Sequence, residues 1–320
     1  MNLGFAGGVN VRIDAATGDV LVLLNQDCVV ERGWLEQMAA AFETDPRIGI
    51  VGVTVYDADG SLNHAGAEIV RPEGHSRHLT EIRASEPYAV DYVTGAAYAV
   101  SRAAWAAVGR FDDGYFPAYF EEADYCYRAR RAGFETVYAP EAKVVHLLSS
   151  TEALSHPFRH AATQHRMRYR FVCKHFRRDE LEAFFIAEME SVAAQSYLNE
   201  IFGRAVAAHD TLQGLNDILG KRRLDLDEEV DTDLQVLMRR GFTRIARRAL
   251  AETSRLGRPQ SEDLSRLQAH LTELQQREYD LVHRIYFRGP TDRRPESTIK
   301  RLRRLLVQSF PLKLLQNHIA

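Results

Sequence analysis

Short apolar runs alternate with helix-forming stretches along the first 150 residues. The apolar runs end in polar or turn-forming residues, as strands buried within a parallel sheet do. The stretches between them favour helix and stop at glycine or at an Asp-Pro turn. The expected strands are residues 19–27, 48–56, 91–100 and 136–145, and the expected helices are residues 34–44, 101–109 and 121–133, with an earlier helix ending near Gly18. This alternation predicts an α/β fold with a mostly parallel sheet flanked by helices.

The pattern changes near residue 151, after which strand-like runs vanish and the sequence is charged and helix-favouring. Breaks between helices are expected near Gly220 and at the Gly-Pro-containing turns of residues 257–259 and 289–290. An all-helical C-terminal region therefore follows the α/β part. We divide the chain into an α/β domain at 1–150, a helical region at 151–290 and a C-terminal helix at 291–320.

Composition narrows the class of protein. The chain has 320 residues, of which 45% are hydrophobic, so it can bury a sizeable core. A net charge of -3 gives no general attraction to nucleic acid, and we expect no nucleic-acid partner. Three cysteines, an odd number without metal-type pairing, fit a reducing cytosol. Because no run is long and apolar enough to span a bilayer and no signal peptide is visible, we expect a cytoplasmic protein.

The segment 291–320 is the part of the chain most suited to a membrane surface. Seven lysines and arginines stand there against two acids, and apolar residues recur at helical spacing. A basic amphipathic helix of this kind can lie on anionic lipid at the inner face of a membrane. The alternative, which the sequence slightly favours, is an ordinary helix whose apolar stripe packs on the protein.

Three carboxylates crowd the start of the helix expected at residues 121–133, namely Glu121, Glu122 and Asp124. In one interpretation they favour the positive end of the helix dipole, with Asp124 paired to Arg128 one turn later. In the other, the aromatic residues just before them raise a carboxyl pKa and suit it to accepting a proton. Spacing alone leaves both interpretations open.

Two further polar residues follow expected strands. Asp27 comes just past the end of an apolar run, where open α/β sheets bind ligands. His146 follows the last strand, and a lone histidine in such a place is more often a structural hydrogen-bonder than a metal ligand. The sequence pattern by itself therefore favours a binding role for Asp27 only.

Five short motifs in order give the chain its resemblance to a known family. They are Asn-Leu-Gly-Phe-Ala-Gly-Gly-Val-Asn at 2–10, Leu-Leu-Asn-Gln-Asp at 23–27, Val-Thr-Gly-Ala-Ala at 93–97, Gly-Arg-Phe-Asp-Asp at 109–113 and the acidic stretch at 120–128. Their order and spacing resemble the inverting glycosyltransferases of family 2, in the rhamnosyltransferase-like branch, over about residues 2–175. The resemblance implies a GT-A fold, which is a nucleotide-sugar-binding α/β domain.

The resemblance also implies roles for individual residues. Asp27 matches the acid that holds a divalent cation, Mn²⁺ or Mg²⁺, on the donor diphosphate, and His146 matches a further metal ligand. Glu122 matches the general base, with Glu121 as a rival and Asp124 completing the catalytic cluster. The positions implied for donor and acceptor binding are Asn2, Gly4, Phe5, Gly8, Asn10, Asn25, Gly95, Ala96 and Asp112.

The reaction implied by the resemblance is transfer of a sugar from a nucleotide-sugar donor to a hydroxyl of a saccharide or glycolipid acceptor. In this family a strand, a helix and a strand precede the Asn-Leu-Gly-Phe motif, whereas here Met1 comes directly before it. We therefore expect an N-terminally truncated sheet whose open edge a partner chain or second copy could cover. The alternative is a non-catalytic relic that binds carbohydrate or a partner glycosyltransferase.

Overall fold

The computed structural model describes residues 2–147, 157–226 and 230–256. All of them fall within one compact unit, Met1–Leu267. The predicted boundary near residue 150, the breaks at 257–259 and 289–290 and the basic helix at 291–320 lie outside the described residues.

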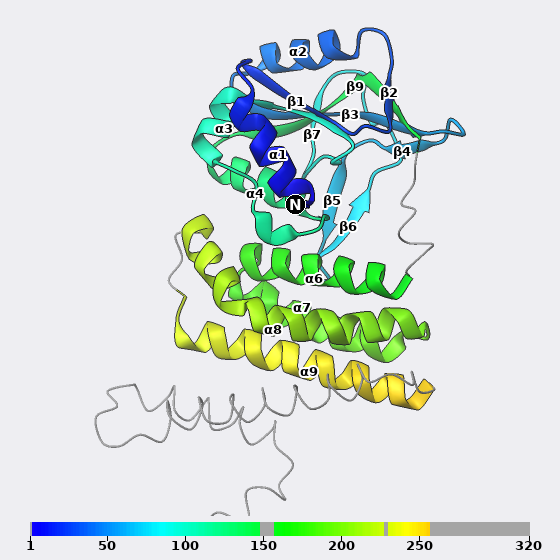
Figure 1. The fold of residues 1–320 in the computed structure, drawn as a ribbon, viewed down its shortest axis with the longest axis vertical. Helices are drawn as coiled ribbons and strands as arrows, with labels where there is room; N and C mark the ends of the chain where they lie inside the picture. Colours follow the sequence, from blue (N-terminus) through cyan, green and yellow to red (C-terminus); the bar gives the residue numbers. More distant parts are fainter. Residues whose placement is uncertain (1, 148–156, 227–229, 257–320) are drawn as a thin grey trace, which may run out of the picture. The chain divides into compact units, whose positions relative to one another are not determined.

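A mixed sheet forms the centre of the α/β part (Figure 1). Its main strands follow the order β1, β8, β3, β9, β2, with β4 paired to β3 and β7 paired to β9. The strands are β1 (Val20–Leu24), β2 (Cys28–Val30), β3 (Ile48–Asp57), β4 (Leu62–His64), β7 (Tyr88–Ala89), β8 (Ala97–Ser101) and β9 (Glu135–His146). The α/β class with a helical C-terminal region is confirmed.

The strand directions differ from the mostly parallel sheet that was predicted. Among the described strands, β3 and β9 pair in parallel, while the other pairings in this sheet are antiparallel. The apolar run of β1 was interpreted as buried on both faces, yet Leu21 and Leu23 are buried and their neighbours along the strand are exposed. An apolar run marks a strand without encoding its direction, which depends on the connections between strands.

Helices cover both faces of the sheet, as Figure 1 shows for α2 and α4. Helix α2 (Trp34–Thr44) packs its apolar stripe, including Trp34 and Met38, against β3 and β9. On the other face lie α3 (Arg102–Val108), whose N-terminus is capped by the Ser101 hydroxyl, and α4 (Glu121–Arg131). The sheet core is thus closed on both sides.

The chain begins with α1 (Gly4–Ala15), which lies beside the loop that leads into α4. The buried Asn10 amide donates to the Phe111 carbonyl at 3.0 Å and accepts from the Phe111 N–H at 2.9 Å. Phe5 N–H donates to the Pro117 carbonyl at 2.8 Å. These bonds tie α1 to residues 111–117, just before α4 and its carboxylates.

A hairpin of β5 (Ala67–Val70) and β6 (His75–His78) was not expected from the sequence. It extends from the sheet towards α6 (Pro157–His175) (Figure 1). At its turn, Gly74 has φ +68°, and a Cβ there would lie 2.4 Å from Val172 of α6. The hairpin therefore links the sheet to the helical region.

Four helices make up the described helical region, and α6 is the one nearest the sheet (Figure 1). The other three are α7 (Arg178–Ala194), α8 (Leu198–Leu226) and α9 (Thr232–Leu256). The break predicted near Gly220 is wrong, because α8 continues through it; one glycine costs a helix about 1 kcal/mol, and buried Ile218 and Leu219 outweigh that. Across the described ranges, no helix is long and apolar enough to cross a membrane.

Candidate functional site

A pocket of about 310 Å³ lies where α4 begins, next to the ends of β1 and β9. Helix α6 contributes Gln164 to its wall, so the α/β part and the helical region build the pocket together. Seven residues predicted for the site line it, namely Phe5, Asn25, Gly95, Ala96, Glu121, Glu122 and His146. Residues more than a hundred positions apart in the sequence are thus gathered around one cavity.

The backbone turns sharply just before α4. Tyr119 and Phe120 have φ of 86° and 69°, a left-handed conformation that costs a non-glycine residue on the order of 1–3 kcal/mol. The Tyr119 hydroxyl bonds to the His160 ring at 3.3 Å, and the Phe120 ring packs on Phe171 with centroids 5.5 Å apart. These contacts with α6 hold the strained turn that places Glu121 and Glu122 at the helix start.

The two glutamates differ from ordinary surface acids. Burial raises the pKa of Glu122 to about 7, although N–H groups, including that of Gly95, donate to its carboxylate. Burial and the neighbouring charge of Glu122 also raise the pKa of Glu121 well above its usual range. Oε2 of each glutamate is buried and has no hydrogen-bond partner within the described residues. A carboxyl group that titrates near neutral pH beside a cavity can accept a proton from a ligand.

Asp27, Cys28 and His146 form a second group at the pocket. Their ligand atoms all lie within 4.8 Å of one another. His146 Nε2 is 3.2 Å from Asp27 Oδ2, but no hydrogen bond satisfies this buried nitrogen within the described part of the chain. The Cys28 thiol is 3.5 Å from the Ala96 carbonyl, and burial followed by the charge of Asp27 raises its pKa to about 11.

These residues fit a divalent cation. An imidazole nitrogen without a partner, placed next to a carboxylate oxygen, is a ready pair of ligands for Mn²⁺ and is compatible with Mg²⁺. His146 itself lines the pocket that contains Glu122, so a cation held here would face the same cavity. The structure thus brings the predicted metal residues and the predicted base to one place.

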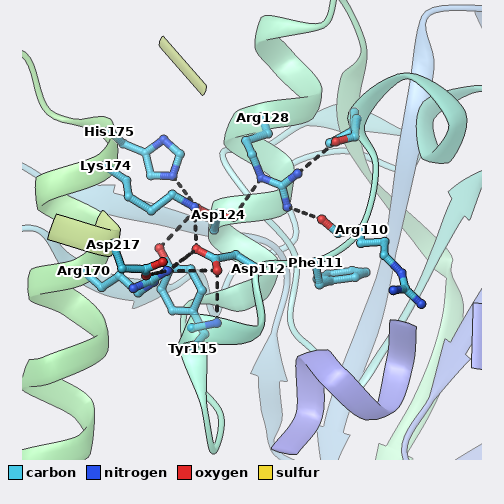
Figure 2. Close-up of polar contacts among 12 residues, drawn as sticks. Arg110, Phe111, Asp112, Tyr115, Asp124, Arg128, Arg170, Lys174, His175 and Asp217 are labelled. Carbon is cyan, nitrogen blue, oxygen red and sulfur yellow. Dashed lines mark hydrogen bonds and ion pairs between the residues drawn. The ribbon is translucent and has the colours of Figure 1, made fainter. Parts of the chain in front are cut away.

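Asp124 lies away from this pocket, at the contact between α4 and α6 (Figure 2). Its carboxylate is fully buried, with Lys174 Nζ at 2.5 Å, His175 Nε2 at 2.8 Å and Arg128 Nε at 2.9 Å. Burial opposes its charge, but Lys174 and Arg128 outweigh burial and hold the pKa of Asp124 well below its usual range. The structure does not bring Asp124 to the reacting groups, and the predicted pairing with Arg128 is present.

Asp112 and Asn10 line a second cavity, of about 420 Å³. Asp112 accepts hydrogen bonds from Arg170 and Lys174 of α6, as Figure 2 shows. The amide of Asn10 is taken up by the Phe111 backbone. Both side chains therefore hold elements together at this point, and neither reaches the pocket of Glu122.

The remaining predicted binding positions shape the start of α1. The Asn2 side chain accepts from the Gly4 N–H at 2.9 Å. Gly4 has φ +68°, and a Cβ there would lie 2.7 Å from the Pro117 carbonyl oxygen, so glycine is required by both conformation and space. A Cβ on Gly8 would meet nothing within 4 Å. None of these three residues lines the pocket.

Sequence reasoning missed part of the pocket wall, including Ser76, His78 and Gln164. Ser76 and His78 come from the unpredicted hairpin, and burial lowers the pKa of His78. The turn signal at Pro72 to Gly74 between two β-favouring stretches could have revealed that hairpin. Nothing in the local pattern around Gln164 distinguishes it from a surface helix residue.

Residues 2–170 match the family model described as glycosyltransferase like family 2. Because this match covers more than half of the chain, the protein belongs to that family.

Curated relatives resemble the chain in part. An uncharacterized protein, y4gI, of Sinorhizobium fredii is 28% identical over 149 residues, which are 43% of this chain and 16% of that protein. The N-acetylglucosaminyl-diphospho-decaprenol L-rhamnosyltransferase of Mycobacterium tuberculosis is 26% identical over 198 residues, which are 53% of this chain and 64% of that enzyme. The matches thus span less than two thirds of either relative. A crystal structure of GalNAc-T7 with UDP, GalNAc and Mn²⁺ aligns with a TM-score of 0.45 at 17% identity, over 60% of this chain and 38% of that one.

Proposed function

We propose that this protein transfers a sugar from a nucleoside-diphosphate sugar to a hydroxyl group of a saccharide or glycolipid, with inversion at the anomeric carbon. The observation that carries the proposal is the pocket shared by Glu122, whose pKa is raised to about 7, and by His146, which lies beside Asp27. Family membership supports this class of reaction.

Glu122 is the general base in this proposal. Its carboxylate removes the proton from the acceptor hydroxyl as that oxygen attacks the anomeric carbon, and the bond from that carbon to the diphosphate oxygen breaks. The Gly95 N–H holds the carboxylate in place, and the missing side chain of Gly95 lets the substrate approach. Glu121, with its raised pKa, stays protonated beside the base and adds no second charge. The displacement is direct, so it needs no covalent enzyme intermediate.

Asp27 and His146 are the residues that would hold the divalent cation. When bound, Mn²⁺ or Mg²⁺ supplies positive charge that offsets the charge developing on the leaving diphosphate. Asn25, whose backbone N–H donates to the Ala96 carbonyl at 2.9 Å, and Phe5 line the same cavity and are proposed to contact the substrates.

Calorimetric titration of the full chain with UDP-, dTDP- and GDP-sugars, with and without Mn²⁺, tests the proposal. We expect saturable heat with one donor that requires Mn²⁺ and is lost in Asp27→Ala, because that variant removes the carboxylate next to His146. The exposed Asp179→Ala variant on α7 is the matched control and should bind as the original chain does. Absence of metal-dependent heat with every donor would contradict the proposal and favour a non-catalytic binding module.

A further inference from the structure

Strand pairing puts a cysteine beside the proposed cation ligands. Strands β2 and β9 run antiparallel, and Cys28 is the register partner of His146. Side chains of directly opposed residues lie on the same face of a sheet, with Cβ atoms about 4.5–5.5 Å apart. Asp27 precedes Cys28 and completes the trio, whose ligand atoms lie within 4.8 Å of one another. The fold therefore presents one oxygen, one nitrogen and one sulfur to a common point.

The three side chains are also prepared to receive an ion. His146 Nε2 is a buried nitrogen without a hydrogen-bond partner in the described ranges, although Asp27 Oδ2 is 3.2 Å away. The Cys28 sulfur is partly buried, and its contact with the Ala96 carbonyl at 3.5 Å is a weak hydrogen bond. A ligand that replaces this contact with a metal–sulfur bond gains more than it loses.

We propose that Cys28 is a third metal ligand and that the centre binds a thiophilic divalent cation such as Zn²⁺ more tightly than Mn²⁺ or Mg²⁺. Thiolate and imidazole ligands favour zinc, whereas the harder cations prefer oxygen and gain little from sulfur. On binding, the Cys28 S–H bond breaks, its proton passes to the solvent and the sulfur binds the metal. Three protein ligands leave the fourth position of a tetrahedral zinc site open to water or to a ligand in the pocket.

The movement required is small. Metal–ligand bonds of about 2.0–2.3 Å place the ligand atoms of a tetrahedral site roughly 3.3–3.8 Å apart. The Asp27 and His146 atoms, at 3.2 Å, are already close to this spacing. Since the sulfur lies within 4.8 Å of both, it must move inward by roughly 1 Å or less.

Cobalt(II) spectroscopy of the full chain tests this inference. Co²⁺ reports on zinc sites because a thiolate ligand gives a charge-transfer band in the near ultraviolet. We expect this band in the original chain and its loss in Cys28→Ser, with Zn²⁺ affinity lowered by roughly tenfold or more and Mn²⁺ affinity unchanged. Cys126→Ser is the matched control, because that buried thiol lies outside the trio and its band and affinities should stay as in the original chain.

Two results would overturn the inference: a cobalt complex without the band, or a Cys28→Ser variant that keeps both the band and the zinc affinity. The measurement uses metal ions alone, without a sugar nucleotide. Failure of the proposed sugar transfer would therefore leave the cobalt result intact, and an absent band would leave the role of Glu122 untouched.

Discussion

At the scale of single residues, the site depends on the way the backbone and burial change the acidity of Glu122. Two left-handed residues, Tyr119 and Phe120, precede the helix and direct its first residues into the pocket. Burial then makes the ionised form of Glu122 less stable than in water, which raises its pKa from an ordinary 4.5 to about 7. The same environment that suits Glu122 to accepting a proton must therefore destabilise the folded chain when the group is charged.

This cost predicts a pH-dependent effect of Glu122→Gln on stability. The folded state binds a proton more tightly than the unfolded state, so the original chain loses stability as pH rises from about 4.5 to about 7. The glutamine variant cannot ionise, so at pH 8 it should be more stable by about 1–2 kcal/mol, a value reduced for partial exposure, whereas at pH 4 the difference should vanish. Urea unfolding at both pH values measures this.

Exposed Glu36→Gln on α2 is the matched control and should show no such trend. An equal effect of Glu122→Gln at pH 4 and pH 8 would show that burial does not perturb this carboxyl group.

At the scale of elements, the contact between α4 and α6 explains the acid that is absent from the pocket. Lys174 of α6 reaches both Asp124 at 2.5 Å and Asp112 at 2.8 Å (Figure 2). Burial lowers the pKa of His175 to about 4, so its neutral ring donates to Asp124 through Nε2 and accepts from Arg131 at Nδ1. This buried network fixes the start of α4 against α6, and with it the position of the two glutamates.

Removing the shared cation should therefore be costly. Lys174→Met leaves two buried carboxylates short of a positive partner, and we expect a loss of about 3–5 kcal/mol in the free energy of unfolding. Lys143→Met, which breaks a more exposed pair with Glu141, should cost about 1 kcal/mol or less. Urea unfolding of both variants decides the matter; equal losses would mean that the network does not hold α4 in place.

Local signals predicted many of these elements well. Helix α2 was expected at 34–44 and is found at Trp34–Thr44, and Ser101 caps α3 as expected. The helix of the acidic cluster stops near Gly133, which has φ +89°. The β5–β6 hairpin was missed because its strands are short, and β6 carries polar residues such as His75 and His78. Its stability comes from packing against α6, a contact that no local pattern encodes.

At the scale of the whole molecule, the sequence could predict which residues matter better than where they lie. The family resemblance named both Glu122 and Asp112, yet only Glu122 reaches the pocket, because the salt bridges of Asp112 depend on α6 far along the chain. Gln164 enters the pocket for the same reason. Sheet and helices form one compact unit, so the site depends on long-range contacts that spacing within a motif cannot reveal.

The central claim is that Glu122 is the base of a sugar transfer, and the most direct measurement compares turnover of the full chain with that of Glu122→Gln. The assay follows release of nucleoside diphosphate from the donor identified by calorimetry, with octyl glycosides as probe acceptors and Mn²⁺ present. We predict a fall of roughly 10²- to 10⁴-fold with donor binding retained, because the amide cannot take the proton. A Glu122→Gln protein that turns over at the original rate would contradict the account.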